Sequence, residues 1–127
     1  MKVRVESDSR GRKTVQDACM RPCPIERGMR ILGGKWTGSI LWHLKDDAVR
    51  FNDLTRLVGG ASKKMIAERL HQLEKQGLIE RKVLDTQPVA VEYRITAFGR
   101  TALACLDELR RWSESLPEPL IDQINSG

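Results

Sequence analysis

The side chains of this 127-residue chain with the greatest intrinsic reactivity belong to three cysteines and two histidines. Cys23 together with His43 or His71 could in principle supply a thiol nucleophile and its base. No catalytic signature surrounds these residues, however, and the sequence contains no glycine-rich phosphate-binding loop. Such a short chain also leaves little room for a substrate cavity. We therefore predict that the protein is not an enzyme.

Cysteine and histidine also bind metals, but their spacing here does not fit a metal site. Cys19 and Cys23 lack the usual Cys-x2-Cys spacing, and the two histidines do not form a His-x3-His pair. We expect neither a metal nor a cofactor. An odd number of cysteines cannot pair completely within one chain, which favours free thiols and a reducing, cytoplasmic compartment.

Cys23 stands immediately before Pro24, and proline is favoured in the first turn of a helix. The unpaired N–H groups and the positive dipole end of a helix N-terminus stabilise a thiolate. Arg21 and Arg27 add positive charge nearby, whereas Glu26 opposes it. This position favours a regulatory thiol. The alternative, of equal weight, is a small capping residue without a sensing role.

The segment from Ser62 to Gly77 has the most regular helical pattern, because Ser62 is a favoured N-cap and Gly77 a favoured stop. The apolar side chains at helical spacing are Ile66, Leu70 and Leu73. The opposite side presents Lys64, Ala67, Glu68, His71 and Lys75, with Lys63 and Arg69 on its flanks. Lysine and histidine can donate to phosphates or guanine, glutamate can accept from cytosine, and an alanine methyl can contact thymine. We predict a DNA-reading face; a solvated amphipathic face is the alternative.

Three shorter helical segments precede this one. The first opens at Pro24 and ends at Gly33-Gly34, and its apolar side chains are Ile25, Met29 and Leu32. The second runs from about residue 35 to 45, and its buried stripe is Trp36, Ile40, Leu41 and Leu44. The third is short and ends at Gly59-Gly60, and its inward residues are Phe51, Leu54 and Leu57.

Residues 78–84 and 91–95 alternate between apolar and polar side chains, which indicates two strands. The turn residues 85–88 between them predict an antiparallel hairpin. The strand cations that could contact phosphates are Arg81, Lys82 and Arg94. The hairpin tip, residues 85–89, has no lysine or arginine, so it is poorly suited to enter a minor groove.

A long last helix is predicted from Thr96 to Leu116, where Pro117 and Pro119 end it. Its apolar side chains follow a coiled-coil-like 4-3-4-3-4 spacing: Phe98, Ala102, Cys105, Leu109, Trp112 and Leu116. Leu103 and Leu106 flank this stripe, so one side can pack on its own domain while the other contacts a twofold partner. We predict a dimer interface here.

Two short helices joined by a glycine turn and followed by a hairpin describe a winged helix-turn-helix. The fold class is α+β, mainly α, with a two-stranded wing and a long C-terminal dimerisation helix. We expect a flexible basic arm at residues 1–18, one domain at 19–116 and an acidic tail of doubtful order at 117–127. The formal charge is +5 with a pI of about 9.4, and no segment is apolar enough to span a membrane.

A series of motifs, over roughly residues 19 to 114, resembles the motifs of the HxlR-type regulators. The opening motifs are Cys23-Pro24-Ile25-Glu26-Arg27 and Ile31-Leu32-Gly33-Gly34-Lys35-Trp36-Thr37. The later ones are Arg50-Phe51-Asn52-Asp53-Leu54, Ala61-Ser62-Lys63-Lys64-Met65, Arg69-Leu70-His71-Gln72-Leu73-Glu74, Gly77-Leu78-Ile79 and Tyr93-Arg94-Ile95-Thr96-Ala97-Phe98-Gly99-Arg100. The resemblance implies a MarR-like winged helix, an operator-binding homodimer and regulation of nearby genes. It also implies a response to oxidants or electrophiles in some members, through a cysteine that Cys23 matches.

The sequence thus predicts a cytoplasmic homodimer that binds an inverted-repeat site in double-stranded DNA and regulates transcription. An inducer, either a small molecule or an electrophile, fits this function. The alternative is a winged helix that binds another protein without sequence-specific DNA binding. Salt separates the two, because duplex binding weakens steeply as salt rises and an apolar protein contact does not.

Overall fold

The structure, a computed structural model, describes residues 5–7, 13–15 and 23–126, and the chain divides into two units at Gly34. In the first unit, β1 (Val5–Ser7) pairs antiparallel with β2 (Lys13–Val15). Both strands lie within residues 1–18, where the sequence analysis predicted an arm and identified no strands. The predicted first helix is confirmed as α1 (Pro24–Leu32), and its Ile25 and Met29 are exposed.

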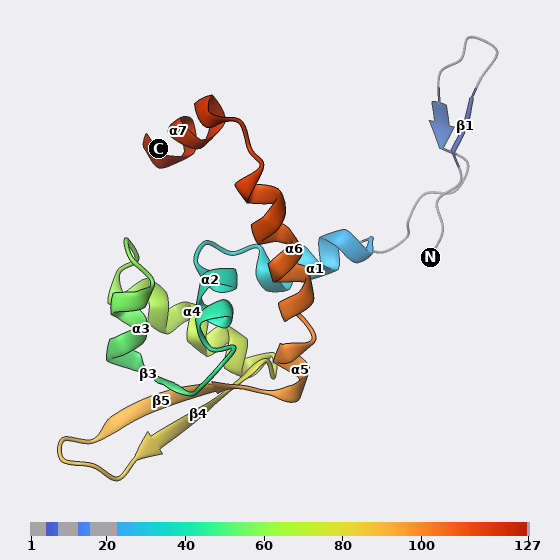
Figure 1. The fold of residues 1–127 in the computed structure, drawn as a ribbon. Helices are drawn as coiled ribbons and strands as arrows, with labels where there is room; N and C mark the ends of the chain where they lie inside the picture. Colours follow the sequence, from blue (N-terminus) through green and yellow to red (C-terminus); the bar gives the residue numbers. More distant parts are fainter. Residues whose placement is uncertain (1–4, 8–12, 16–22, 127) are drawn as a thin grey trace. The chain divides into compact units, whose positions relative to one another are not determined.

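The core of the second unit, residues 35–127, is built on three helices, whose order along the chain is visible in Figure 1. They are α2 (Thr37–His43), α3 (Phe51–Leu57) and α4 (Lys63–Lys75). The predicted inward residues Ile40, Leu41, Leu44, Leu54, Ile66, Leu70 and Leu73 are all buried. The prediction for Leu57 was wrong, because α3 ends there and the chain turns. Leu57 is 50% exposed, and Val58 takes the inward position.

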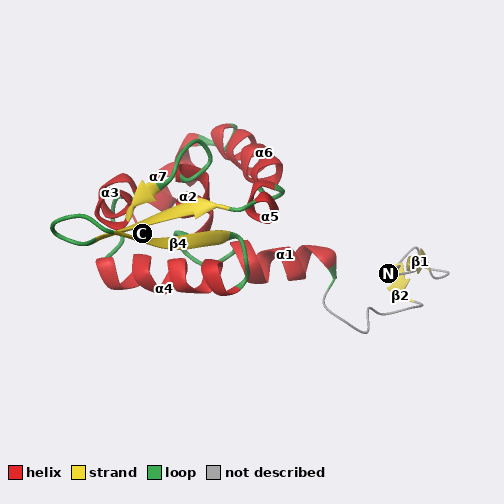
Figure 2. Cartoon of the chain, turned by 90° about the horizontal axis from the view of Figure 1, so that it is seen from below, coloured by secondary structure: helices red, strands yellow, loops and turns green. Residues whose placement is uncertain are grey.

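A three-stranded antiparallel sheet lies beside these helices. Its strands are β3 (Val49–Arg50), β4 (Ile79–Leu84) and β5 (Ala90–Ile95), in the order β3-β5-β4. The predicted hairpin is confirmed, and its tip extends beyond the helices (Figure 1). The third strand, β3, was not predicted, since two residues are too few to show alternation. In Figure 2 α4 runs along the sheet, and α4 contacts β4 while α3 contacts β3 and β5.

The single long last helix was a wrong prediction, because the chain forms two helices there. They are α5 (Ala97–Arg100) and α6 (Leu103–Glu114), with a turn at Thr101 and Ala102 between them. Gly99 is buried so closely against the Leu78 carbonyl that a methyl group would not fit. This contact ties α5 to Leu78, the residue before β4, and the turn into α6 follows two residues after Gly99.

Residues 118–126, expected as a tail of doubtful order, form the helix α7 (Glu118–Ser126). Pro119 lies in its first turn, where a missing N–H costs no helical hydrogen bond. Within the described residues, no helix combines the length and the apolar character that crossing a membrane requires.

Candidate nucleic-acid interface

The N-terminus of α4 is built by local contacts that the sequence predicts. The Ser62 hydroxyl accepts a hydrogen bond from the Met65 backbone N–H at 3.1 Å, which confirms Ser62 as the N-cap. Gly60, in the turn before it, has φ of +91°, a conformation that favours glycine. At the other end, Gly77 has φ of +84° and stops the helix. The turn between α3 and α4 thus has helix-turn-helix geometry.

The outward side of α4 forms a single polar face. Its exposed members are Lys63, Lys64, Ala67, Glu68, His71 and Lys75. None of these side chains forms an ion pair or a side-chain hydrogen bond within the part of the chain that the structure describes. The face therefore presents free donors, one acceptor and one methyl group. These are the groups that read base edges and phosphates in a major groove. We call it the α4 face.

Arg69, predicted beside these residues, has a different environment. It is half-buried, and its Nε donates to the Lys35 carbonyl oxygen at 3.0 Å. Its Nη1 donates to Oε1 of Gln72 at 3.3 Å. The guanidinium is therefore engaged by the chain itself.

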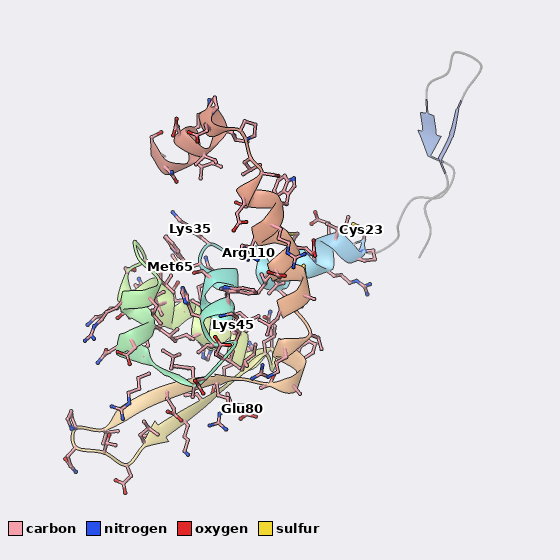
Figure 3. The ribbon with its side chains drawn as sticks, viewed as in Figure 1. Cys23, Lys35, Lys45, Met65, Glu80 and Arg110 are labelled. Atoms are coloured by element: carbon pink, nitrogen blue, oxygen red, sulfur yellow. The ribbon has the colours of Figure 1, made fainter. Side chains whose placement is uncertain are left out.

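The three strand cations predicted as phosphate contacts do not share one face of the sheet. Arg81 lies opposite Tyr93, on the face that also carries the buried Ile79 and Ile95, although Arg81 itself is exposed. Lys82 lies opposite Glu92 on the other face, and Arg94 lies opposite Glu80 there (Figure 3 labels Glu80). Because each of these two cations has a carboxylate across the strand, that face has no excess positive charge.

A groove of about 590 Å³ separates α3 from the hairpin tip. Its lining includes Arg50 and Arg56 on one side and Thr86 and Gln87 on the other. The Arg56 side chain is 80% exposed, and its only ion-pair contact in the described chain is Asp53 at 3.6 Å. These arginines were not among the predicted site residues. The available signal was the place of Arg56 on α3, the first helix of the motif, and of Arg50 immediately before it, because this helix crosses the DNA backbone in such proteins.

The predicted dimer stripe lies along α5 and α6. Phe98, Leu109 and Trp112 are 53%, 55% and 63% exposed, whereas Leu106 is buried against its own unit. Cys105 is also exposed, and Ala102 and Leu116 are half-buried. Within the part of the chain that the structure describes, the three large side chains on this surface remain exposed.

Charged residues on α6 form ion pairs at helical spacing. Arg110, labelled in Figure 3, donates to Asp107 at 2.8 Å and to Glu114 at 2.7 Å. The hydrogen bond from Arg110 holds the pKa of the Asp107 carboxyl below its ordinary value, and the same bond raises the pKa of Arg110. Because the aspartate pKa is lowered, the pair stabilises α6 at neutral pH and loses this contribution as the pH falls through the lowered value.

Cys23 is the N-cap residue of α1, as its sequence position predicts, and Figure 3 shows it at the start of that helix. Its carbonyl oxygen accepts from the Arg27 N–H at 3.0 Å, and its thiol makes no capping hydrogen bond. The side chain is half-buried. Cys19 lies outside the described residues. In the described ranges, no three histidine, cysteine, aspartate or glutamate side chains gather as a metal site would require.

Comparison with known proteins shows which protein family has this architecture. The profile of the HxlR-like helix-turn-helix family matches residues 31–120. YdeP of Bacillus subtilis, an uncharacterised HTH-type transcriptional regulator, is 39% identical over 104 residues, which cover 82% of this chain and 80% of YdeP.

Two solved structures are also similar. One is described as a transcriptional regulator of the MarR family from Porphyromonas gingivalis, with a TM-score of 0.74 and 30% identity over 80% of this chain and 100% of that one. The other is the redox regulator HypR in its oxidised form, with a TM-score of 0.71 and 34% identity over 76% of this chain and 99% of HypR. The predicted winged helix-turn-helix is thereby confirmed.

Proposed function

The chain belongs to the HxlR-like helix-turn-helix family and is a transcriptional regulator of that type, and from this premise we propose that it binds duplex DNA sequence-specifically as a homodimer. The observation that supports this most directly is the α4 face, whose unpaired donors follow a capped helix start. A helix of this kind fits the major groove, where each base pair presents a distinct pattern of donors and acceptors.

The proposed contacts divide into those that read bases and those that position the protein. Lys64 and His71 are the base-edge donors, and Glu68 and Ala67 are suited to cytosine and thymine. Ser62 and Lys63 lie at the positive end of the helix dipole and serve phosphates. Phosphate contacts from Lys75 and from the strand cations, Arg81, Lys82 and Arg94, belong to the same proposal.

Dimerisation is proposed through the exposed apolar side chains of α5 and α6. Pairing these surfaces about a twofold axis would remove Phe98, Leu109 and Trp112 from water. A twofold dimer presents two α4 helices to two half-sites about 34 Å apart, one turn of DNA. The expected operator is therefore an inverted repeat.

We further propose that Cys23 is a regulatory thiol. The similarity to HypR, which is described as a redox regulator, and the position of the thiol at a helix N-cap, where it makes no capping hydrogen bond, support this role. The electrophile class that fits is a quinone. The Cys23 sulfur adds to a ring carbon, and the ring takes up the thiol proton and the electron pair to become a hydroquinone thioether. The added group at the start of α1 would alter operator affinity.

DNA binding is tested by selecting duplexes from a randomised library with the purified protein. Affinities for the selected duplex and for a scrambled duplex of the same composition are then measured by fluorescence anisotropy at several salt concentrations. We expect an enriched inverted repeat and a logarithm of affinity that falls linearly with the logarithm of salt. The absence of any enriched sequence would refute sequence-specific binding. A protein-interaction module would give neither enrichment nor a steep salt dependence.

A further inference from the structure

We propose that Arg69 is a positioning residue, which holds α4 in the orientation that reads DNA and does not itself contact DNA. The inference rests on the proposed function, because it concerns how the α4 face is presented. It distinguishes Arg69 from the lysines around it, although all belong to one cationic stretch of sequence.

The first observation is the bond that leaves α4 for another part of the second unit. Arg69 Nε donates to the carbonyl oxygen of Lys35, a residue 34 positions earlier, just before α2 begins. Its Nη1 is held by Gln72, one turn along α4. Turning the guanidinium towards a phosphate would break both bonds and leave the Lys35 carbonyl without this donor.

The second observation concerns Trp36, which follows Lys35. Its φ is +75°, in the left-handed region that a bulky residue occupies only when its surroundings hold it there. The Trp36 ring lies over Gly60 in the turn before α4, so closely that a Cβ on Gly60 would stand 3.2 Å from the ring. The Lys35 ammonium group lies 5.2 Å from the centre of the same ring.

Together these contacts hold α4 at two places. Trp36 bears on the turn that leads into the helix, and Lys35 is bonded to the middle of the helix through Arg69. Because both residues belong to one short segment, they fix the direction of α4 as well as its position. A small rotation of α4 would misalign Lys64 and His71 with base edges while leaving phosphates within reach of flexible lysines.

The test compares Arg69→Met with Lys63→Met, which removes a proposed phosphate contact of similar side-chain length. Both variants are titrated with the selected duplex and with its scrambled counterpart over a salt series. For Arg69→Met we expect about a tenfold loss of affinity for the selected duplex, the scale of one lost hydrogen bond to a charged group. We expect unchanged affinity for the scrambled duplex and an unchanged salt slope.

Lys63→Met should instead weaken binding to both duplexes equally and reduce the salt slope by about 0.9 per subunit, as expected for a phosphate contact. If Arg69→Met behaves in this way, Arg69 is a phosphate contact and the proposal is wrong. Equal affinity of Arg69→Met and the parent for both duplexes would also overturn it. Should Arg69→Met fail to fold, Arg69→Lys, whose single ammonium group can keep one of the two bonds, is measured with the same expectations and a smaller loss.

Hydrogen exchange on the free protein tests, without DNA, whether Arg69 attaches α4 to the segment at Lys35. Relative to the parent, Arg69→Met should show faster amide exchange in residues 35–40 as well as in α4, and Lys63→Met should show neither. Unchanged exchange in residues 35–40 would contradict the attachment. If the parent selects no duplex, the proposed DNA function fails, and the exchange result still decides whether Arg69 holds α4.

Discussion

At the scale of single residues, the α4 face combines side chains whose hydrogen-bonding abilities differ. Lys64 and His71 are spaced by seven positions, two turns of the helix, so both point to the same side. Glu68 lies between them and repels phosphates. Attraction to phosphates alone therefore does not account for the side chains on this face. Its pattern of donors and acceptors suits selection among base pairs.

The first prediction therefore concerns selectivity. The double variant Lys64→Ala and His71→Ala should lose preference for the selected duplex, by about 1–3 kcal/mol for each good base contact removed. Lys82→Ala, which removes a proposed phosphate contact and no base contact, serves as the control and should retain the preference even if it binds both duplexes more weakly. Anisotropy titrations with selected and scrambled duplexes measure the difference. A folded double variant with unchanged affinity and selectivity would show that other residues read the sequence.

The second prediction at this scale concerns Cys23. Treatment with a quinone should change the affinity of the parent for the selected duplex and leave Cys23→Ser unaffected, because serine lacks the nucleophilic sulfur. Cys105→Ser, in which the exposed thiol of α6 is removed, should respond as the parent does. Responses of equal size in the parent and Cys23→Ser would exclude Cys23 from regulation. With no response in either, Cys23 would be a capping residue only.

At the scale of elements, the junction between the hairpin and α5 is closely packed. The Thr96 hydroxyl donates to the Gly77 carbonyl at 2.7 Å and accepts from the Gly99 N–H at 3.0 Å. Gly99 in turn lies against the Leu78 carbonyl and Ile95. The end of α4, both hairpin strands and the start of α5 therefore meet at one point, which connects the α4 face with α6.

The third prediction follows from this close packing. Gly99→Ala should lower the free energy of unfolding by about 1–3 kcal/mol, because the new methyl group must displace backbone. Gly28→Ala is the matched control: nothing lies within 4 Å of a Cβ there, and alanine is favoured over glycine inside a helix. Urea denaturation of both variants measures the change. Equal stability of Gly99→Ala and the parent would mean that α5 can move away from β4.

At the scale of the whole molecule, the exposed apolar side chains of α5 and α6 are the surface through which we propose that the protein dimerises. Monomeric proteins seldom expose several large apolar side chains on one continuous surface. Here Leu106 faces the interior while Leu109 and Trp112 face outward, so α6 packs on its own unit through one face and leaves an apolar face that fits the proposed dimer.

The fourth prediction is that Leu109→Asp combined with Trp112→Ala converts a dimer to monomers, because burying the new carboxylate is unfavourable. Val83→Asp introduces the same charge at an exposed apolar position on the hairpin and should leave the dimer intact. Sedimentation measures the oligomeric state of the parent, the double variant and Val83→Asp. If the unmodified protein is monomeric at micromolar concentration, with and without DNA, the dimer proposal is wrong.

The sequence by itself determined the features that depend on neighbours along the chain. The N-cap at Ser62, the buried stripe of α4, the stop at Gly77 and the alternating strands of the hairpin all follow from local spacing and were confirmed. Cys23 at the start of α1 belongs to the same class. Such features are predictable because the residues that cause them lie within a few positions of one another.

Only the tertiary structure decided the features that join distant segments. The short strand β3 exists because β5 offers it a partner, and the last helix is divided just after Gly99 packs against Leu78 and Ile95. The register of the hairpin places the strand cations on two faces of the sheet. Arg69 donates a hydrogen bond to a carbonyl oxygen 34 positions earlier in the chain. Spacing along the chain does not encode these contacts, since each depends on how the packed core brings separate elements together.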